Sequence, residues 1–107
     1  MQPDTRSTKR MLQQMEHIIR EVNREVMNPM LPPLDNDHIL PVMAVVAKLR
    51  GAYLKELFHT AQTAESGVPT KDQLQKLKRC REAYEEMLAG AQALEVVVER
   101  GYVDVKF

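Results

Sequence analysis

One helical stripe constrains this chain more than any other feature. Between Thr70 and Val98, apolar and small side chains recur at alternating spacings of three and four residues, which places them on one face of a helix. The members of the stripe are Leu77, Cys80, Tyr84, Met87, Ala91, Leu94 and Val98. Such a face must be covered, and we expect the rest of the chain to supply the cover.

Two further segments have helical patterns. In residues 8–27, apolar side chains again step by three and four, with Met11 and Ile18 beside them; they are Leu12, Met15, Ile19, Val22 and Val26. Residues 37–63 are apolar around most of the helical circumference, so this helix is expected to lie centrally and to contact neighbours on more than one side. Its narrow polar strip contains Ala44, Lys48, Gly51, Lys55 and His59.

Capping residues and helix breakers set the boundaries. Ser7 or Thr8 is expected to cap the first helix, and Asn36 or Asp37 the second. Thr70 and Gln73 have capping-box spacing, and Gly101 suits the left-handed conformation that ends a helix. The loop between the first two helices contains Pro29, Pro32 and Pro33, which a helix cannot pass through. Its apolar residues, Met30, Leu31 and Leu34, are expected to contact the core.

These elements predict an all-α protein, a three-helix up-down-up bundle with helices at 8–27, 37–63 and 71–100. The second and third helices form the main hairpin. A chain of 107 residues is expected to be one domain, 1–107, with a polar tail at 1–6 and an extended tail at 102–107. Because a chain this short buries only a modest core, dimerisation is expected to complete the burial.

Composition narrows the functional classes. The chain is 44% hydrophobic and 28% charged, and 15 basic side chains balance 15 acidic ones. That balance argues against a dedicated nucleic-acid or membrane-surface protein, and the composition against global disorder. A single cysteine fits a reducing compartment. Residues 1–10 lack the apolar centre of a signal peptide, and no apolar run is long enough to cross a membrane. We therefore expect a soluble, cytoplasmic protein.

The charges of the third helix run against the helix dipole, which favours acids at the start and bases at the end. Its first half contains Lys71, Lys76, Lys78, Arg79 and Arg81, and its second half contains Glu82, Glu85, Glu86, Glu95 and Glu99. Two copies packed antiparallel about residues 82–86 would set basic halves against acidic halves in a two-fold homodimer. The alternative is a solvated face with local pairs, Lys78 with Glu82 and Arg81 with Glu85.

Two charged residues fall within apolar faces. Arg50 lies in the apolar arc of the second helix, and Glu95 lies on the stripe of the third. Burying either without a partner would cost several kcal/mol, so each needs an ion-pair partner or marks an interface. Antiparallel packing predicts Arg50 with Glu16, and Glu95 with His38 or with a second subunit. The alternative for Arg50 is a side chain that extends along the surface to water.

The C-terminal tail alternates apolar and polar residues, with Val103, Val105 and Phe107 on one side. We expect it to fold back on the bundle, because several apolar residues rarely stay in water. The alternative is a strand added to the sheet edge of a partner, with Val105 and Phe107 as recognition residues.

The sequence contains no complete constellation for catalysis, a cofactor or a metal. Glu56 and His59 form the Glu-x-x-His step of di-iron bundles, but the step occurs once. Cys80 lies on the apolar stripe and is expected to be a small core residue. There is no glycine-rich phosphate loop or nucleophile elbow. We therefore expect no enzyme, no cofactor and no metal site.

The patterns favour a protein–protein interaction module, such as an adaptor, chaperone or assembly factor, acting as a homodimer or within a larger complex. The alternative function is a nucleic-acid-associated regulator that uses the basic cluster of residues 71–81; a metal-binding bundle ranks below both. The expected interface residues are Arg50, Lys78, Arg79, Arg81, Glu82, Glu85, Glu86, Ala91, Leu94, Glu95, Val98, Val105 and Phe107.

Overall fold

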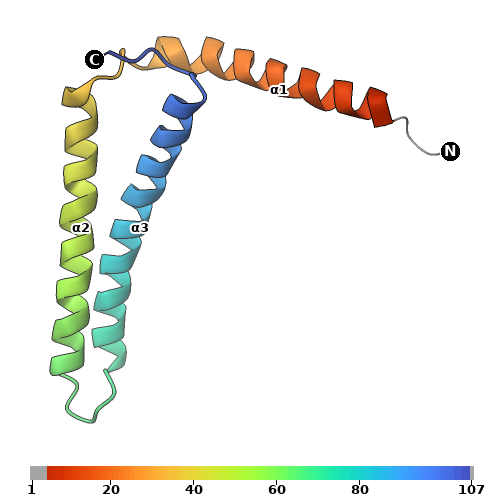
Figure 1. Ribbon diagram of the computed structural model, residues 1–107. Helices are drawn as coiled ribbons and strands as arrows, with labels where there is room; N and C mark the ends of the chain where they lie inside the picture. Colours follow the sequence, from red (N-terminus) through yellow and green to blue (C-terminus); the bar gives the residue numbers. More distant parts are fainter. Residues whose placement is uncertain (1–4, 107) are drawn as a thin grey trace. The chain divides into compact units, whose positions relative to one another are not determined.

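The structure is a computed structural model that describes residues 5–106, and over this range the regular secondary structure is entirely helical (Figure 1). The helices are α1 (Thr5–Met27), the 3₁₀ turn η1 (Asn28–Met30), α2 (Asn36–Gln62) and α3 (Lys71–Glu99). The prediction of three helices in an all-α protein is confirmed, and both ends of α2 and α3 lie within one residue of the predicted positions. Dimerisation stays a prediction.

The first helix begins earlier than its sequence pattern indicated. Ser7 and Thr8 lie inside α1 (Thr5–Met27), so neither residue is the cap. Residues 5–10 contain no glycine or proline, and therefore nothing stops the helix from extending before its first apolar residue. Of the predicted polar tail 1–6, residues 1–4 lie outside the described range.

Both ends of α3 have the capping geometry that the sequence predicted. The Thr70 amide donates to Gln73 Oε1 at 2.8 Å, and the Gln73 amide donates to Thr70 Oγ1 at 3.2 Å, which completes a capping box. At the other end Gly101 has φ of 69°. Its amide donates to the Val98 carbonyl, and the Tyr102 amide donates to the Val97 carbonyl, which is the Schellman arrangement.

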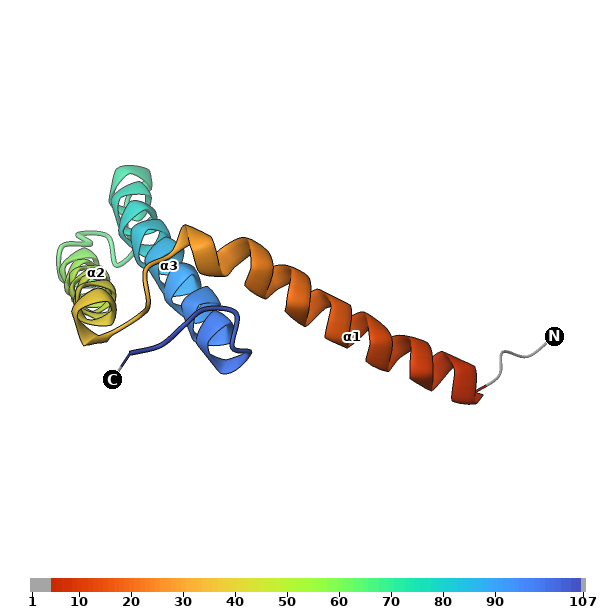
Figure 2. The ribbon, with the colours of Figure 1, turned by 90° about the horizontal axis from the view of Figure 1, so that it is seen from above.

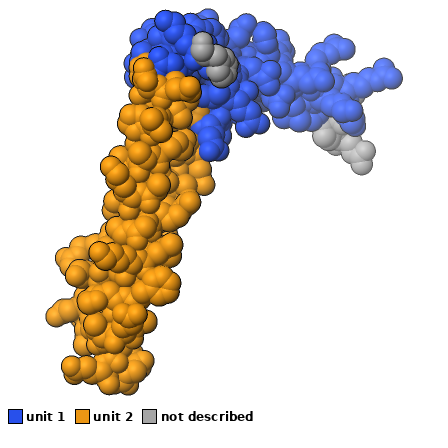
Figure 3. Space-filling view, turned by 60° about the vertical axis from the view of Figure 1, so that its left-hand side comes forward, with its two compact units in different colours: residues 1–35, 95–107 blue, residues 36–94 orange. Residues whose placement is uncertain are grey.

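The chain divides into two compact units (Figure 3). Residues 36–94 form unit 2, while residues 1–35 and 95–107 form unit 1. The prediction that the whole chain behaves as a single domain stays a prediction, and each unit is described by itself below.

Unit 2 is an antiparallel hairpin of α2 and α3, which lie side by side in two views (Figures 1 and 2). Buried and half-buried side chains recur at spacings of three and four along both helices, as in coiled-coil packing. On α2 they are Ile39, Val42, Val46, Leu49, Tyr53, Glu56 and Thr60. On α3 they are Gln73, Leu77, Cys80, Tyr84, Met87, Ala91 and Leu94. The predicted stripe is therefore confirmed from Leu77 to Leu94.

Polar contacts follow the same seam. Arg50 Nε donates to the Tyr84 hydroxyl at 3.0 Å, and its guanidinium carbon lies 5.3 Å from the centre of the Tyr84 ring. The rings of Tyr53 and Tyr84 are 6.2 Å apart. Nearer the loop, Lys76 pairs with Glu56 at 3.8 Å. These contacts link α2 to α3 at two levels along the hairpin.

Unit 1 has a small apolar centre where the C-terminal tail meets the proline loop. Tyr102 is 5% exposed, Val103 is 3% exposed and Leu34 is 5% exposed. Leu34 and Val105 form an isolated parallel bridge, in which the Leu34 amide donates to the Asp104 carbonyl at 2.9 Å and the Lys106 amide donates to the Leu34 carbonyl at 2.6 Å. Of the three loop residues expected to contact the core, only Leu34 is buried.

The close packing of the seam leads to a testable prediction at Ala91, which is 4% exposed. Ala91→Leu adds volume where α3 is most closely packed, and we expect it to lower the free energy of unfolding by about 1–3 kcal/mol. The matched control is Ala89→Leu on the exposed side of α3, which should change stability by about 0.5 kcal/mol or less. Urea denaturation followed by circular dichroism measures both, and equal effects would contradict the packing described.

Candidate interaction surfaces

The apolar stripe of α1 is exposed along its whole length. The structure buries no described residue of this helix. Each of its large apolar side chains from Met11 to Val26 is about half exposed; they are Met11, Leu12, Met15, Ile18, Ile19, Val22 and Val26. A contiguous apolar stripe of this kind on a protein surface is typical of an interaction site.

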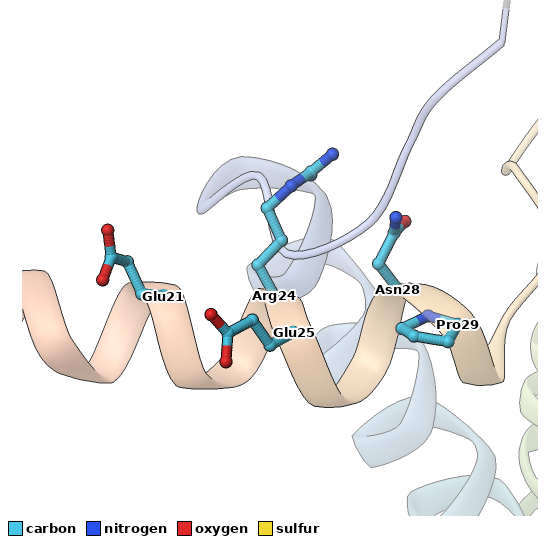
Figure 4. A pocket seen from close by; sticks show the side chains of 5 residues that line it. All are labelled: Glu21, Arg24, Glu25, Asn28 and Pro29. Atoms are coloured by element: carbon cyan, nitrogen blue, oxygen red, sulfur yellow. The ribbon is translucent and has the colours of Figure 1, made fainter.

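The opposite side of α1 is the side that contacts the tail. Figure 4 shows Arg24 and Asn28 on one side of the last turns, pointing toward the C-terminal segment. Arg24 is two residues from both Val22 and Val26, which corresponds to about 200° of rotation around the helix. The tail therefore binds the polar side of α1 and leaves the apolar stripe uncovered.

Arg24 connects α1 to two parts of the chain that are far away in sequence. One guanidinium nitrogen donates to the Gly101 carbonyl at 2.8 Å, and the other pairs with Asp104 Oδ1 at 2.5 Å. Asn28 adds two contacts to Asp104: its side-chain oxygen accepts from the Asp104 amide at 2.9 Å, and its Nδ2 lies 3.5 Å from Oδ2. Both residues thus hold the tail in place, each through its side chain.

These contacts change the acidity of Asp104. The hydrogen bond from Arg24 and, after it, the one from Asn28 lower the pKa of the Asp104 carboxyl below its ordinary value of 3.8, because both favour the ionised form. Slight desolvation acts in the opposite direction and is outweighed. The carboxylate that fixes the tail is therefore ionised throughout the neutral range.

The second uncovered surface is the outer face of α2. We define it as the series of residues that begins at Leu40 and continues at alternating spacings of three and four positions. It consists of Leu40, Met43, Ala47, Arg50, Leu54, Leu57 and Ala61, with Phe58 at its edge. Leu40 is 69% exposed and Phe58 is 64% exposed. The helix therefore has two neighbouring apolar faces: one packs along α3, and the other contacts α3 through Arg50, whose partner is Tyr84.

The two charged residues placed within apolar faces, Arg50 and Glu95, are both exposed. Neither is a buried charge, which agrees with the alternative in which Arg50 extends along the surface. Its contact on α3 is Tyr84, a partner that the sequence did not indicate. The predicted pairs Arg50–Glu16 and Glu95–His38 join residues of different units and stay predictions.

The charged residues of α3 form the local pairs that were predicted as the alternative to a dimer. Lys78 lies 3.8 Å from Glu82, and Arg81 lies 3.7 Å from Glu85. All four side chains are about half exposed, so each pair contributes little to stability. Arg79 and Glu86 are exposed as well. The alternative function in nucleic-acid binding stays a prediction, and these pairs weaken the positive potential that it would need.

The stripe of α3 does not divide after Met87 into a core segment and an interface segment. The sequence suggested a core segment at 77–87 and an interface segment at 91–98. Ala91 is instead the most buried residue of α3, and Leu94 is half-buried, so the packed segment continues through both. Val98 is exposed, and Val97 takes the half-buried position.

The C-terminal tail folds back on its own chain, as preferred from the sequence. Val105 pairs with Leu34 through the bridge described above and is 37% exposed. Phe107 lies outside the described residues. The alternative role of the tail in adding a strand to a partner would require this bridge to open.

The sequence had suggested Glu56 and His59 as metal ligands, and the structure places both near the loop end of the hairpin. A shallow surface pocket there is lined by these two residues and Thr60, Thr63, Asp72, Gln73 and Lys76. Glu56 is paired with Lys76, and the buried Thr60 hydroxyl has no hydrogen-bond partner. Over residues 5–106, no group of three or more His, Cys, Asp or Glu side chains is arranged to hold a metal ion. Cys80 is half-buried on the packed face.

Comparison with protein-family models, with curated proteins and with solved structures gave no match. Among the helices of residues 5–106, none is both long enough and apolar enough to span a membrane.

Two features of the surfaces were missed by sequence reasoning. The Arg24–Asp104 contact joins residues 80 positions apart, and pattern reading cannot pair such residues, although Asp104 is the only acid of the tail. The outer face of α2 had a signal that was available: its apolar residues form a second series at spacings of three and four beside the first. Sequence reasoning treated both series as one broad apolar arc.

The contact between Arg24 and Asp104 predicts a pH effect. In Arg24→Gln, the pKa of Asp104 should rise toward its ordinary value, because the largest influence that lowers it is removed. A depressed carboxyl pKa gives stabilisation that is complete above the ordinary value and is lost as the pH falls through the folded-state value. The wild-type tail should therefore stay docked to a lower pH than the tail of the variant.

This effect is measured by nuclear magnetic resonance titration of the Asp104 carboxyl carbon. Arg20→Gln is the matched control, since it removes the same charge one turn earlier in α1. Identical Asp104 pKa values in the wild type and in Arg24→Gln would show that the contact does not form in solution.

Proposed function

We propose that this chain is a protein–protein interaction module that works as a homodimer or as a subunit of a larger complex. The observation that carries the proposal is the apolar stripe of α1, from Met11 to Val26, which is about half exposed throughout. The tail is held on the opposite side of the same helix by Arg24. A helix that presents an apolar stripe and is anchored on its polar side is suited to binding in a groove of another protein surface.

The energetics favour this use of the stripe. Burying a Val, Ile, Leu or Met side chain contributes about 1.5–3 kcal/mol when burial is complete. Several half-exposed side chains on one stripe can therefore supply the free energy of a specific interface. The charged residues on either side of the stripe, such as Glu16 and Glu25, would then determine which partner binds and in which orientation. They would contribute less to the affinity.

The test is a double substitution in the stripe, Ile19→Gln with Val22→Gln. Because two apolar side chains lose their burial, binding to the partner should weaken at least about tenfold. The matched control is His17→Gln with Arg20→Gln on the polar side of α1, which should leave binding unchanged. Light scattering gives the mass of the assembly, and quantitative affinity capture gives the loss of partner.

Circular dichroism must show equal helix content in the three proteins for the comparison to hold. Retention of every partner by the stripe variant would contradict the proposal. So would a wild-type chain that stays monomeric and captures no other protein.

A further inference from the structure

We draw no further inference here: the strongest candidate, the exposed outer face of α2 from Leu40 to Ala61 with Phe58 at its edge, is an apolar surface patch, and nothing in the structure shows what covers it.

Discussion

The seam between α2 and α3 is the interaction on which unit 2 depends. Its side chains recur at spacings of three and four on both helices, and Tyr84 anchors the register through Arg50 and Tyr53. Because the seam occupies one face of α2, the apolar residues one position further along, about 100° around the helix, lie outside it. The surface available for a partner is therefore a consequence of how the hairpin packs.

In unit 1 the corresponding role belongs to Arg24. Its guanidinium contacts the turn that ends α3, through the Gly101 carbonyl, and the tail, through Asp104. The donors of one side chain therefore link a helix, a helix terminus and an extended segment. Because these bonds use the polar side of α1, they orient the helix without covering its apolar side. The contacts that hold α1 in unit 1 and the apolar side chains available to a partner therefore lie on two different sides of the same helix.

The features predicted correctly are those set by local chemistry. The capping box of Thr70 and Gln73 and the left-handed Gly101 depend on residues a few positions apart, so their sequence signals were sufficient. The features that were not predicted depend on distant residues. The contacts of Arg24 with Asp104 and of Arg50 with Tyr84 are products of tertiary folding. The core segment expected to end at Met87 continues through Ala91 and Leu94, because periodicity identifies a face without showing where its burial ends, and the interface role of Glu95 and Val98 stays a prediction.

The division of the chain into units has a consequence for how the protein can vary in length. Unit 2 is one uninterrupted stretch, 36–94, whose two ends both join unit 1. Seven residues inserted in α2 and seven in α3, next to the loop, would preserve the phase of the seam and lengthen the hairpin by two turns. No residue of the contacts around Arg24 would change. The hairpin can therefore differ in length while the contacts that Arg24 makes within unit 1 remain the same.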